Sequence, residues 1–151
     1  MKIYIGGRIS GLSYPEVAEY FDSTKKQLQE WGYYVYSPMT AKNAIRTEIK
    51  LRSVGYGNPE SSNHAIFERD KWCVTQADIF YLNLIGCHND FVSIGGTMEL
   101  AWASLLGKHT VVSMPKDSMH RHAFILEGAD TVYDTHEEAM EYLRKLITQE
   151  A

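Results

Sequence analysis

Near its start the chain reads Lys2-Ile3-Tyr4-Ile5-Gly6-Gly7, an apolar run that stops at a glycine pair. A run of this length bounded by glycine predicts a short buried strand. A helix is predicted next, because Ser13 and Glu16 have the spacing of a capping box and apolar residues recur behind them until Gly32. The chain therefore starts with a strand followed by a helix, the repeating unit of an α/β fold.

The same alternation continues along the rest of the sequence. Further strands are predicted at residues 33–36, 78–84, 109–114 and 131–133. Further helices are predicted at residues 63–77, from just after the glycine pair 95–96 as far as 106, at 123–126 and at 135–147. Alternating strands and helices predict a parallel sheet covered on both faces, with right-handed crossovers. Five strands favour a flavodoxin-like, doubly wound α/β fold with the order 2-1-3-4-5. No repeat or linker interrupts the pattern, so residues 1–151 are expected to form one domain.

Composition excludes several classes of protein. The chain has 151 residues, of which 44% are hydrophobic and 23% charged, as is usual for a globular domain with a real core. Its net charge of −4 argues against a nucleic-acid polymer as partner, although single nucleotides stay open. Cys73 and Cys87 form neither a CxxC motif nor a disulfide framework, which indicates a reducing compartment. With no signal peptide and no membrane-length apolar run, we expect a cytoplasmic protein without a membrane partner.

In a sheet of this order, ligands bind beyond the carboxyl ends of the strands, where the order reverses between strands 1 and 3. Three loops are expected to converge there: residues 6–11, residues 86–93, and the irregular stretch 39–63, whose length is typical of a functional loop or lid. The first of these, Gly6-Gly7-Arg8-Ile9-Ser10-Gly11, offers backbone N–H groups, a hydroxyl and a guanidinium. Such groups suit a phosphate or a sugar hydroxyl, although the turn is neither a GxGxxG nor a Walker motif.

A second loop leads into Ser93-Ile94-Gly95-Gly96-Thr97-Met98-Glu99-Leu100, the start of an apolar helix. We expect Glu99 in the first turn of this helix, where partial positive charge and unpaired N–H groups favour an ionised acid. The glycines let a ligand approach the backbone. A charged carboxylate beside an open turn is what a nucleophile for a sugar carbon requires, although such an acid also serves simply to offset the helix dipole. Ser93 either offers its hydroxyl to the ligand or caps the helix.

Asp70 is the second candidate acid. It lies on the inward stripe of the helix 63–77, whose apolar members are Ile66, Phe67, Cys73, Val74 and Ala77. Desolvation there should raise the pKa of Asp70, as suits a general acid; the alternative is a buried carboxylate satisfied by loop N–H groups. We therefore expect opposed environments, with Glu99 ionised and Asp70 protonated, which would assign nucleophile and acid. A retaining glycosyl transfer would need the two carboxyl groups about 5 Å apart.

The remaining cluster of interest is His120-Arg121-His122. A metal site there would lack a clear third ligand. We therefore expect no metal, and interpret the cluster as solvated loop residues or as contacts across a subunit interface.

Together these residues resemble the nucleoside 2-deoxyribosyltransferase superfamily, which includes the deoxyribosyltransferases and the 2′-deoxynucleoside 5′-phosphate N-hydrolases. The likeness is densest at residues 2–11, at Asp70 with Gln76-Ala77-Asp78-Ile79, and at residues 93–108. It implies a flavodoxin-like fold, a nucleophilic Glu99 that attacks C1′ to form a glycosyl-enzyme intermediate, and an Asp70 that interacts with the leaving base. It also implies a homodimer or higher homo-oligomer whose neighbouring subunit completes each pocket. Tyr4, from its place on the first strand, is expected to touch the nucleophile.

Two departures from the family leave the acceptor open. The transferases carry an acid six residues before the nucleophile, where this chain has Ser93, which looks like the phosphate-binding position of the N-hydrolases. The residue donated by the neighbour is usually Asn in the transferases and Ser in the hydrolases, and the matching position here is His122. A histidine there could meet a 5′-phosphate, with Arg8 in support.

We therefore predict an enzyme that cleaves the N-glycosidic bond of a 2′-deoxyribonucleoside or its 5′-monophosphate and passes the sugar to another nucleobase or to water. The predicted catalytic residues are Glu99, Asp70 and Tyr4, and the predicted substrate-binding residues are Gly6, Gly7, Arg8, Ile9, Ser10, Gly11, Ser93, Gly95 and His122. No metal or organic cofactor is expected, because the carboxylate and the sugar cation do the chemistry. The alternative is a non-catalytic module that binds a nucleotide or an ADP-ribose-like ligand, which would not need an acid pair.

Overall fold

The computed structural model describes residues 1–87 and 92–151, which form one parallel sheet of five strands. The strands are β1 (Lys2–Gly7), β2 (Tyr34–Tyr36), β3 (Ile79–Asn83), β4 (His109–Ser113) and β5 (Thr131–Tyr133). They lie in the order β2-β1-β3-β4-β5, and each neighbouring pair is parallel. The predicted α/β fold class, with its flavodoxin-like order, is confirmed.

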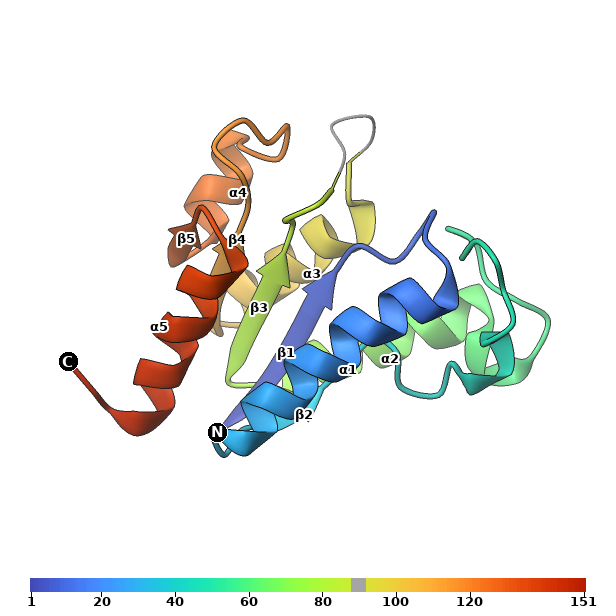
Figure 1. Ribbon diagram of the computed structural model, residues 1–151. Helices are drawn as coiled ribbons and strands as arrows, with labels where there is room; N and C mark the ends of the chain where they lie inside the picture. The colour runs from blue at the N-terminus through green and yellow to red at the C-terminus, as the bar shows by residue number, and fades with distance from the viewer. Residues whose placement is uncertain (88–91) are drawn as a thin grey trace.

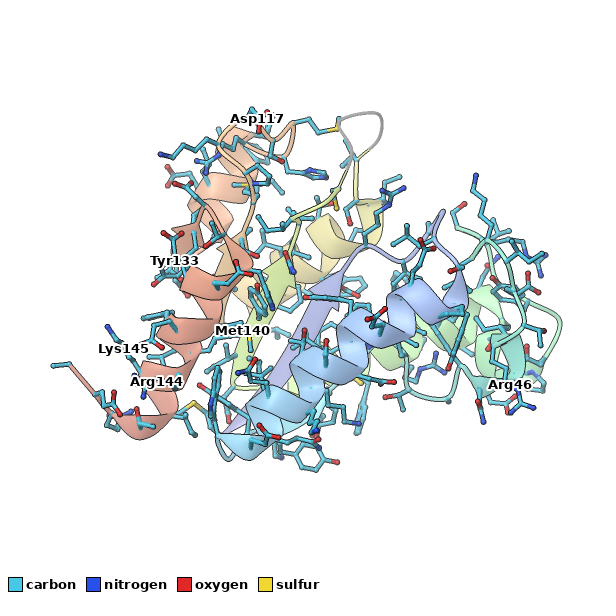
Figure 2. The ribbon with its side chains drawn as sticks, viewed as in Figure 1. Arg46, Asp117, Tyr133, Met140, Arg144 and Lys145 are labelled. Atoms are coloured by element: carbon cyan, nitrogen blue, oxygen red, sulfur yellow. The ribbon has the colours of Figure 1, made fainter. Side chains whose placement is uncertain are left out.

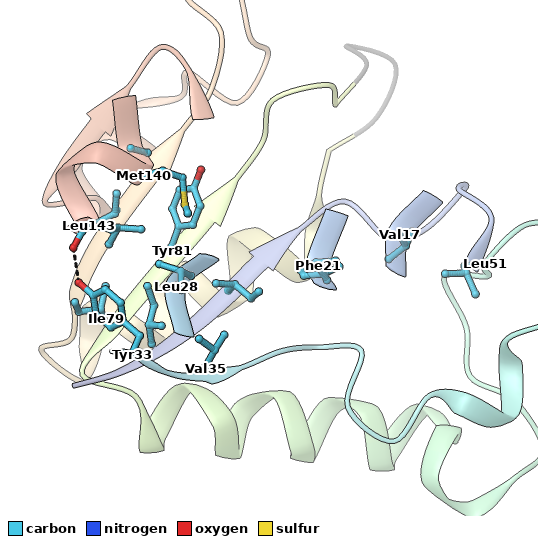
Figure 3. Packing of buried hydrophobic residues seen from close by; sticks show 14 of the residues in the cluster. Val17, Phe21, Leu28, Tyr33, Val35, Leu51, Ile79, Tyr81, Met140 and Leu143 are labelled. Carbon is cyan, nitrogen blue, oxygen red and sulfur yellow. Dashed lines mark hydrogen bonds between the residues drawn. The ribbon is translucent and has the colours of Figure 1, made fainter. Parts of the chain in front are cut away.

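Helices cover both faces of this sheet (Figure 1). They are α1 (Tyr14–Glu30), α2 (Asn63–Gln76), α3 (Ile94–Leu105), α4 (Ala123–Gly128) and α5 (His136–Thr148), with short 3-10 turns η1 (Asn43–Ile45) and η2 (Pro59–Ser61). On the α1 and α5 face, Ile3 and Ile5 of β1 enter the core shown in Figure 3, where the Tyr33 hydroxyl donates to the Leu143 carbonyl at 2.7 Å. On the other face, Tyr4 enters a second core with residues of α2 and α3. Alternation along β1 therefore directs Tyr4 toward the helices that carry the two candidate acids.

Local capping signals explain where the helices begin and end. The Ser13–Glu16 capping box is present at the start of α1, and Gly32 follows its end with a φ of +100°. The helix α2 begins at Asn63, as predicted for residues 63–77, and the residue before it, Ser62, is the N-cap. Ser62 has extended backbone there, so its hydroxyl reaches the Ala65 N–H.

The connection between β2 and α2, residues 37–62, is packed onto the turn after β1. The Gly11 N–H donates to the Leu51 carbonyl at 2.9 Å, and the Leu51 N–H donates to the Leu12 carbonyl at 2.7 Å. Ile45 and Leu51 are buried in the core beside α1. This 37–62 segment is therefore anchored by both hydrogen bonds and apolar burial, and it borders the edge of the sheet at which ligands are expected.

All strands point the same way, so their carboxyl ends gather at one edge, where the β1–α1 turn and the start of α3 lie (Figure 1). Residues 1 and 151 lie at the opposite edge (Figure 1). Residues 88–91 of the predicted loop 86–93 fall outside the described residues. Within the described ranges, no helix combines the length and the apolar character needed to cross a bilayer.

Candidate active site

The three predicted catalytic residues lie close together near the carboxyl edge of the sheet. Tyr4 lies in the middle of β1 and is fully buried, while Glu99 of α3 and Asp70 of α2 are only 8% and 9% exposed. The Tyr4 hydroxyl donates to Glu99 Oε1 at 2.8 Å. Asp70 and Glu99 are close enough for the negative charge of Asp70 to raise the pKa of Glu99. One strand and two helices thus bring a phenol and two carboxyl groups together.

Gly6 makes room for the Glu99 carboxylate. A Cβ atom at this position would lie 3.1 Å from Glu99 Oε2 and 3.2 Å from the ring of Phe80. Tyr4 stacks on the same Phe80 ring, with centroids 5.7 Å apart. A side chain at residue 6 would therefore fit only if the carboxylate and the Phe80 ring shifted by a few tenths of an ångström, so glycine relieves a tight contact here.

The expected position of Glu99 within its helix is wrong. Because α3 begins at Ile94, after Ser93 at the N-cap, Glu99 lies in the second turn, beyond the reach of the helix terminus. The pKa of Glu99 is raised to about 8, chiefly by burial and then by the negative charge of Asp70, and the Tyr4 hydrogen bond and Lys42 oppose this rise. The prediction of a Glu99 kept ionised by a helix terminus is therefore not supported.

The expectation for Asp70 is confirmed in direction. Burial raises its pKa to about 6, while the positive charges of Lys42 and Arg69 lower it. Asp70 Oδ1 is buried and has no hydrogen-bond partner among the described residues, so that oxygen is not satisfied by loop N–H groups. Phe67, expected on the same inward stripe, is instead exposed and packs edge-on against Trp102 at the helix surface.

The two acids consequently share one kind of environment rather than two opposed ones. Both pKa values are raised by burial, and the two groups interact. Interacting acids lose their protons in two steps that belong to the pair. Because each acid raises the cost of ionising the other, there is a range of pH in which the Asp70–Glu99 pair carries one negative charge and one proton. A nucleophile needs the negative charge and an acid needs the proton, so the pair in this state holds what both roles require, whichever oxygen carries the proton in the absence of a ligand.

Lys42 was missed by sequence reasoning. It lies in the 37–62 segment, is only 5% exposed, and its positive charge acts on both Asp70 and Glu99. The segment has no helical or strand periodicity around this residue, so nothing local distinguishes Lys42 from a solvated lysine.

Ser93 lies at the N-cap of α3, but its side chain makes no capping hydrogen bond. Its backbone N–H instead donates to Nε2 of His120 at 2.9 Å. His120 is buried, and burial lowers its pKa, so it is a neutral acceptor that fixes the start of α3. The interpretation of His120 as a solvated loop residue is therefore wrong. Within α3, a Cβ on Gly95 would meet no atom within 4 Å, so the space before this residue is open.

The β1–α1 turn closes on itself and on the 37–62 segment. Gly11 has a φ of +85°, and the Arg8 Nε donates to the Ser10 carbonyl at 3.5 Å. A groove of about 440 Å³ lies between this turn and the segment, lined by Ser10, Gly11, Lys50, Leu51, Arg52, Ser53 and Val54. Lys50 and Arg52 give it a positive charge, in keeping with an anionic or carbonyl-rich ligand.

His122 and Arg121 are held elsewhere in the chain. His122 is the N-cap of α4, where its Nδ1 accepts from the Phe124 N–H at 3.2 Å. Arg121 pairs with Asp134 at 2.6 Å. Within the described part of the chain, no contact joins His122 to Tyr4, Asp70 or Glu99, and no group of three or more His, Cys, Asp or Glu side chains could hold a metal ion.

A second groove, of about 650 Å³, lies over β5 and α5, where Tyr133 and Lys145 line it (Figure 2). Its other lining residues include the carboxylates of Glu137, Glu138 and Glu141. None of the predicted site residues borders it. The chemistry-bearing cluster therefore lies at the carboxyl edge, beside β1 and α3.

Known structures share this architecture. A 2-deoxyribosyltransferase from the psychrotolerant bacterium Bacillus psychrosaccharolyticus aligns with 94% of this chain and 92% of its own, at 22% identity and a TM-score of 0.66. A 2-desoxiribosyltransferase from Leishmania mexicana aligns over 95% and 97%, at 16% identity and a TM-score of 0.59. A CMP N-glycosidase from Clostridium botulinum aligns over 99% of both chains, at 17% identity and a TM-score of 0.55.

At these identities the comparisons concern the fold, and they confirm at that level the resemblance expected from the residues. Models of known protein families give no match to this chain, and neither do curated protein sequences.

Proposed function

We propose that the protein cleaves the N-glycosidic bond of a 2′-deoxyribonucleoside or its 5′-monophosphate, with Glu99 as nucleophile. The observation that carries this proposal is the buried Asp70–Glu99 pair with the Tyr4 hydroxyl bonded to Glu99. Two raised carboxyl pKa values at one place are typical of a catalytic site rather than of a structural one. The shared fold of deoxyribosyltransferases and a CMP N-glycosidase supports the same class of chemistry.

In the first step a bond forms between Glu99 and C1′ of the sugar, and the bond from C1′ to the base nitrogen breaks. Tyr4 occupies Oε1, so Oε2, which lies against Gly6, is the oxygen that attacks. Asp70 gives its proton to the departing base. The proton carried by the pair at neutral pH must therefore lie on Asp70 when the substrate reacts, and the nucleophile must lie in the ionised form.

In the second step an acceptor attacks C1′ and releases Glu99. A nucleobase as acceptor forms a new nucleoside, and water forms the free sugar; in either case the proton of the acceptor returns to Asp70. The Gly6–Gly11 turn, Ser93 and Gly95 would hold the rest of the substrate. This scheme consumes no metal, oxidant or reductant.

A product analysis tests the proposal. The protein is incubated with a panel of deoxynucleosides and their 5′-monophosphates, with and without a second free base, and the products are separated by chromatography. A new nucleoside identifies a transferase, and a free sugar or sugar phosphate identifies a hydrolase. Glu99→Ala is expected to abolish base release, and turnover equal to wild type in this variant would remove Glu99 from the mechanism. Tight nucleotide binding without base release over hours would instead identify a binding module.

A second experiment tests the 5′ end of the substrate. Ser93→Ala is expected to reduce turnover of a 5′-monophosphate more than turnover of the matching nucleoside, because a phosphate needs the hydroxyl and a 5′-hydroxyl does not. The ratio of the two kcat/KM values measures the effect. Equal reductions for both substrates would count against a phosphate at the start of α3.

A further inference from the structure

The Asp70–Glu99 pair creates a charge problem inside the protein. A buried carboxylate is costly unless an opposite charge or hydrogen-bond donors compensate it. Tyr4 supplies one donor to Glu99, and its phenol stays neutral because burial raises its pKa well above the usual value. A neutral donor does not balance the charge that the pair must carry when Glu99 acts as nucleophile.

The 37–62 segment buries a cation, Lys42, whose charge acts on both acids of this pair. Lys42 precedes η1, and its backbone is held in a tight turn, since its N–H donates to the Met39 carbonyl at 3.2 Å and its carbonyl accepts from the Ile45 N–H at 3.1 Å. Ile45 in turn is buried in the core. Lysine is rarely buried this far without a partner, so the position requires an explanation.

The charged groups near the Asp70–Glu99 pair show which groups are the partners of Lys42. The positive charge of Lys42 acts on both Asp70 and Glu99, and the charge of Arg69 acts on Asp70. Arg69 also has a structural contact, because its Nη1 donates to the Glu60 carbonyl at 2.7 Å.

Two further groups complete the surroundings of the pair. Burial raises the pKa of the Cys73 thiol to about 11, so it stays neutral beside the acids. Burial lowers the pKa of Lys42, whereas the charges of Asp70 and Glu99 raise it. The ammonium of Lys42 and the carboxylates therefore stabilise each other's charged forms.

We propose that Lys42 is a positioning residue whose buried ammonium serves as the counter-charge of the Asp70–Glu99 pair, allowing one carboxyl group to be ionised while the other holds a proton. This inference rests on the proposed function, because an ionised Glu99 matters only if it attacks a sugar. It assigns the 37–62 segment an electrostatic part in the chemistry, in addition to its place against the β1–α1 turn.

A carboxyl titration tests the charge relation without any turnover. The protein is labelled with ¹³C at the Asp and Glu carboxyl carbons, and the two signals are assigned with Asp70→Asn and Glu99→Gln. In Lys42→Met, which keeps the length of the side chain and removes its charge, the titration midpoints of the pair are expected to rise by about one pH unit or more. Lys42→Arg should keep them near wild type, and Lys26→Met, on the exposed side of α1, should leave them unchanged.

Unchanged midpoints in a folded Lys42→Met protein would overturn the inference. If this variant does not fold, Lys42→Gln replaces it, and the backbone amide spectrum establishes folding in each case. Once a substrate is known, the acid limb of kcat/KM against pH should rise in Lys42→Met by the same amount as the NMR midpoints, and Lys42→Arg should restore it. A protein that releases no base refutes the proposed function, yet the titration still decides whether Lys42 governs the charge of the pair.

Discussion

At the scale of single residues, burial determines the character of this site more than sequence position does. The N-terminus of α3 was expected to favour the ionised form of Glu99. Burial of the side chain in the core opposes that form instead and raises its pKa. Tyr4 and Lys42 then act against the effect of burial, one by a hydrogen bond and the other by charge. An enzyme of this kind would hold its nucleophile at the edge of ionisation, where binding of a substrate can change the proton's position.

The raised pKa of Glu99 predicts a pH-dependent effect on stability. The folded protein holds the proton more tightly than the unfolded chain, so as the pH rises from 4.5 to about 8 the unfolded chain ionises first and stability is lost. Glu99→Gln has no such proton to lose. The free energy of unfolding of Glu99→Gln minus that of wild type, both measured by urea denaturation, should therefore increase steadily as the pH rises across this window.

The control for this measurement is Glu16→Gln. Glu16 is exposed, and hydrogen bonds from Ser13 lower its pKa, so its titration lies below the window. The difference between this variant and wild type should level off as the pH rises above 4.5, once Glu16 is ionised in the unfolded chain too, and stay constant from there to about 8. A Glu99→Gln difference that is equally constant would contradict the raised pKa of Glu99.

Gly6 supports a second prediction at this scale. Gly6→Ala places a methyl group 3.1 Å from Glu99 Oε2, so the carboxylate is expected to shift from its present position and kcat should fall by about tenfold to a hundredfold. Gly57→Ala is the matched control, because a Cβ there meets no atom within 4 Å. Both variants are compared by steady-state kinetics on the substrate found in the product analysis. Equal kcat values would show that the close approach at Gly6 does not position Glu99.

At the scale of elements, the 37–62 segment is a fixed part of the fold rather than a loose connection. Its hydrogen bonds to the β1–α1 turn and the burial of Leu51 couple it to the residues expected to bind substrate. Lys42 near its start and Leu51 further along give the segment two attachments, one through charge and one through apolar packing.

This attachment is testable through Leu51. Leu51→Ala removes a side chain that is 3% exposed and should cost about 2–4 kcal/mol of stability. The neighbouring Ile49 is 88% exposed, so Ile49→Ala should cost less than about 0.5 kcal/mol. Amide hydrogen exchange should also become faster at Gly11 and Leu51 in the first variant, since their N–H groups join the turn to the segment. Similar stability for both variants would show that Leu51 does not anchor the segment.

The order of the elements could be predicted because their signals are local. A capping box at Ser13 and Glu16, apolar runs and terminal glycines lie within a few residues of the boundaries that they set. The start of α3 could not be placed from such signals. Gly96 suggested a turn before the helix, but it lies in the first helical turn, where a Cβ would come within 2.9 Å of Leu82. It is there because α3 packs closely on β3.

The candidate site also contains residues that could be predicted from the sequence and residues that could not. Glu99, Asp70 and Tyr4 were singled out by residue type and by their places on predicted elements, and the fold brings them together. Lys42 and His120 could not be found, because their burial depends on contacts with residues distant in the sequence. Long-range electrostatics, such as the charge of Asp70 acting on Glu99, likewise requires the fold to be known.

At the scale of the whole molecule, large apolar side chains remain exposed on α3 and α4. Leu105 is 86% and Phe124 84% exposed, and Ile94 and Met98 are also accessible. Because α3 and α4 contact each other, these side chains lie on neighbouring helices, and exposed apolar side chains that gather in this way are typical of an interface. It supports the proposal of a homo-oligomer in which His122, next to Phe124, enters the pocket of a neighbouring subunit.

Phe124→Ser is therefore expected to weaken self-association. Sedimentation velocity over a concentration series measures the effect, and Ile49→Ser, which alters an equally exposed side chain on the 37–62 segment, is the control. We expect the first variant to dissociate at concentrations at which wild type and the control stay associated, because apolar burial between subunits is lost. A wild-type protein that is monomeric throughout the series would refute the proposed assembly.

The common direction of the five strands has a practical consequence. The carboxyl ends of the strands, and with them the candidate site, lie at one edge of the sheet, and residues 1 and 151 lie at the opposite edge (Figure 1). A resin, an affinity handle or a fluorescent protein joined at either of these residues would be held on the far side of the molecule. A tethered sample would thus leave the edge that carries Tyr4, Asp70 and Glu99 open to dissolved ligands, which suits this chain to assays on an immobilised sample.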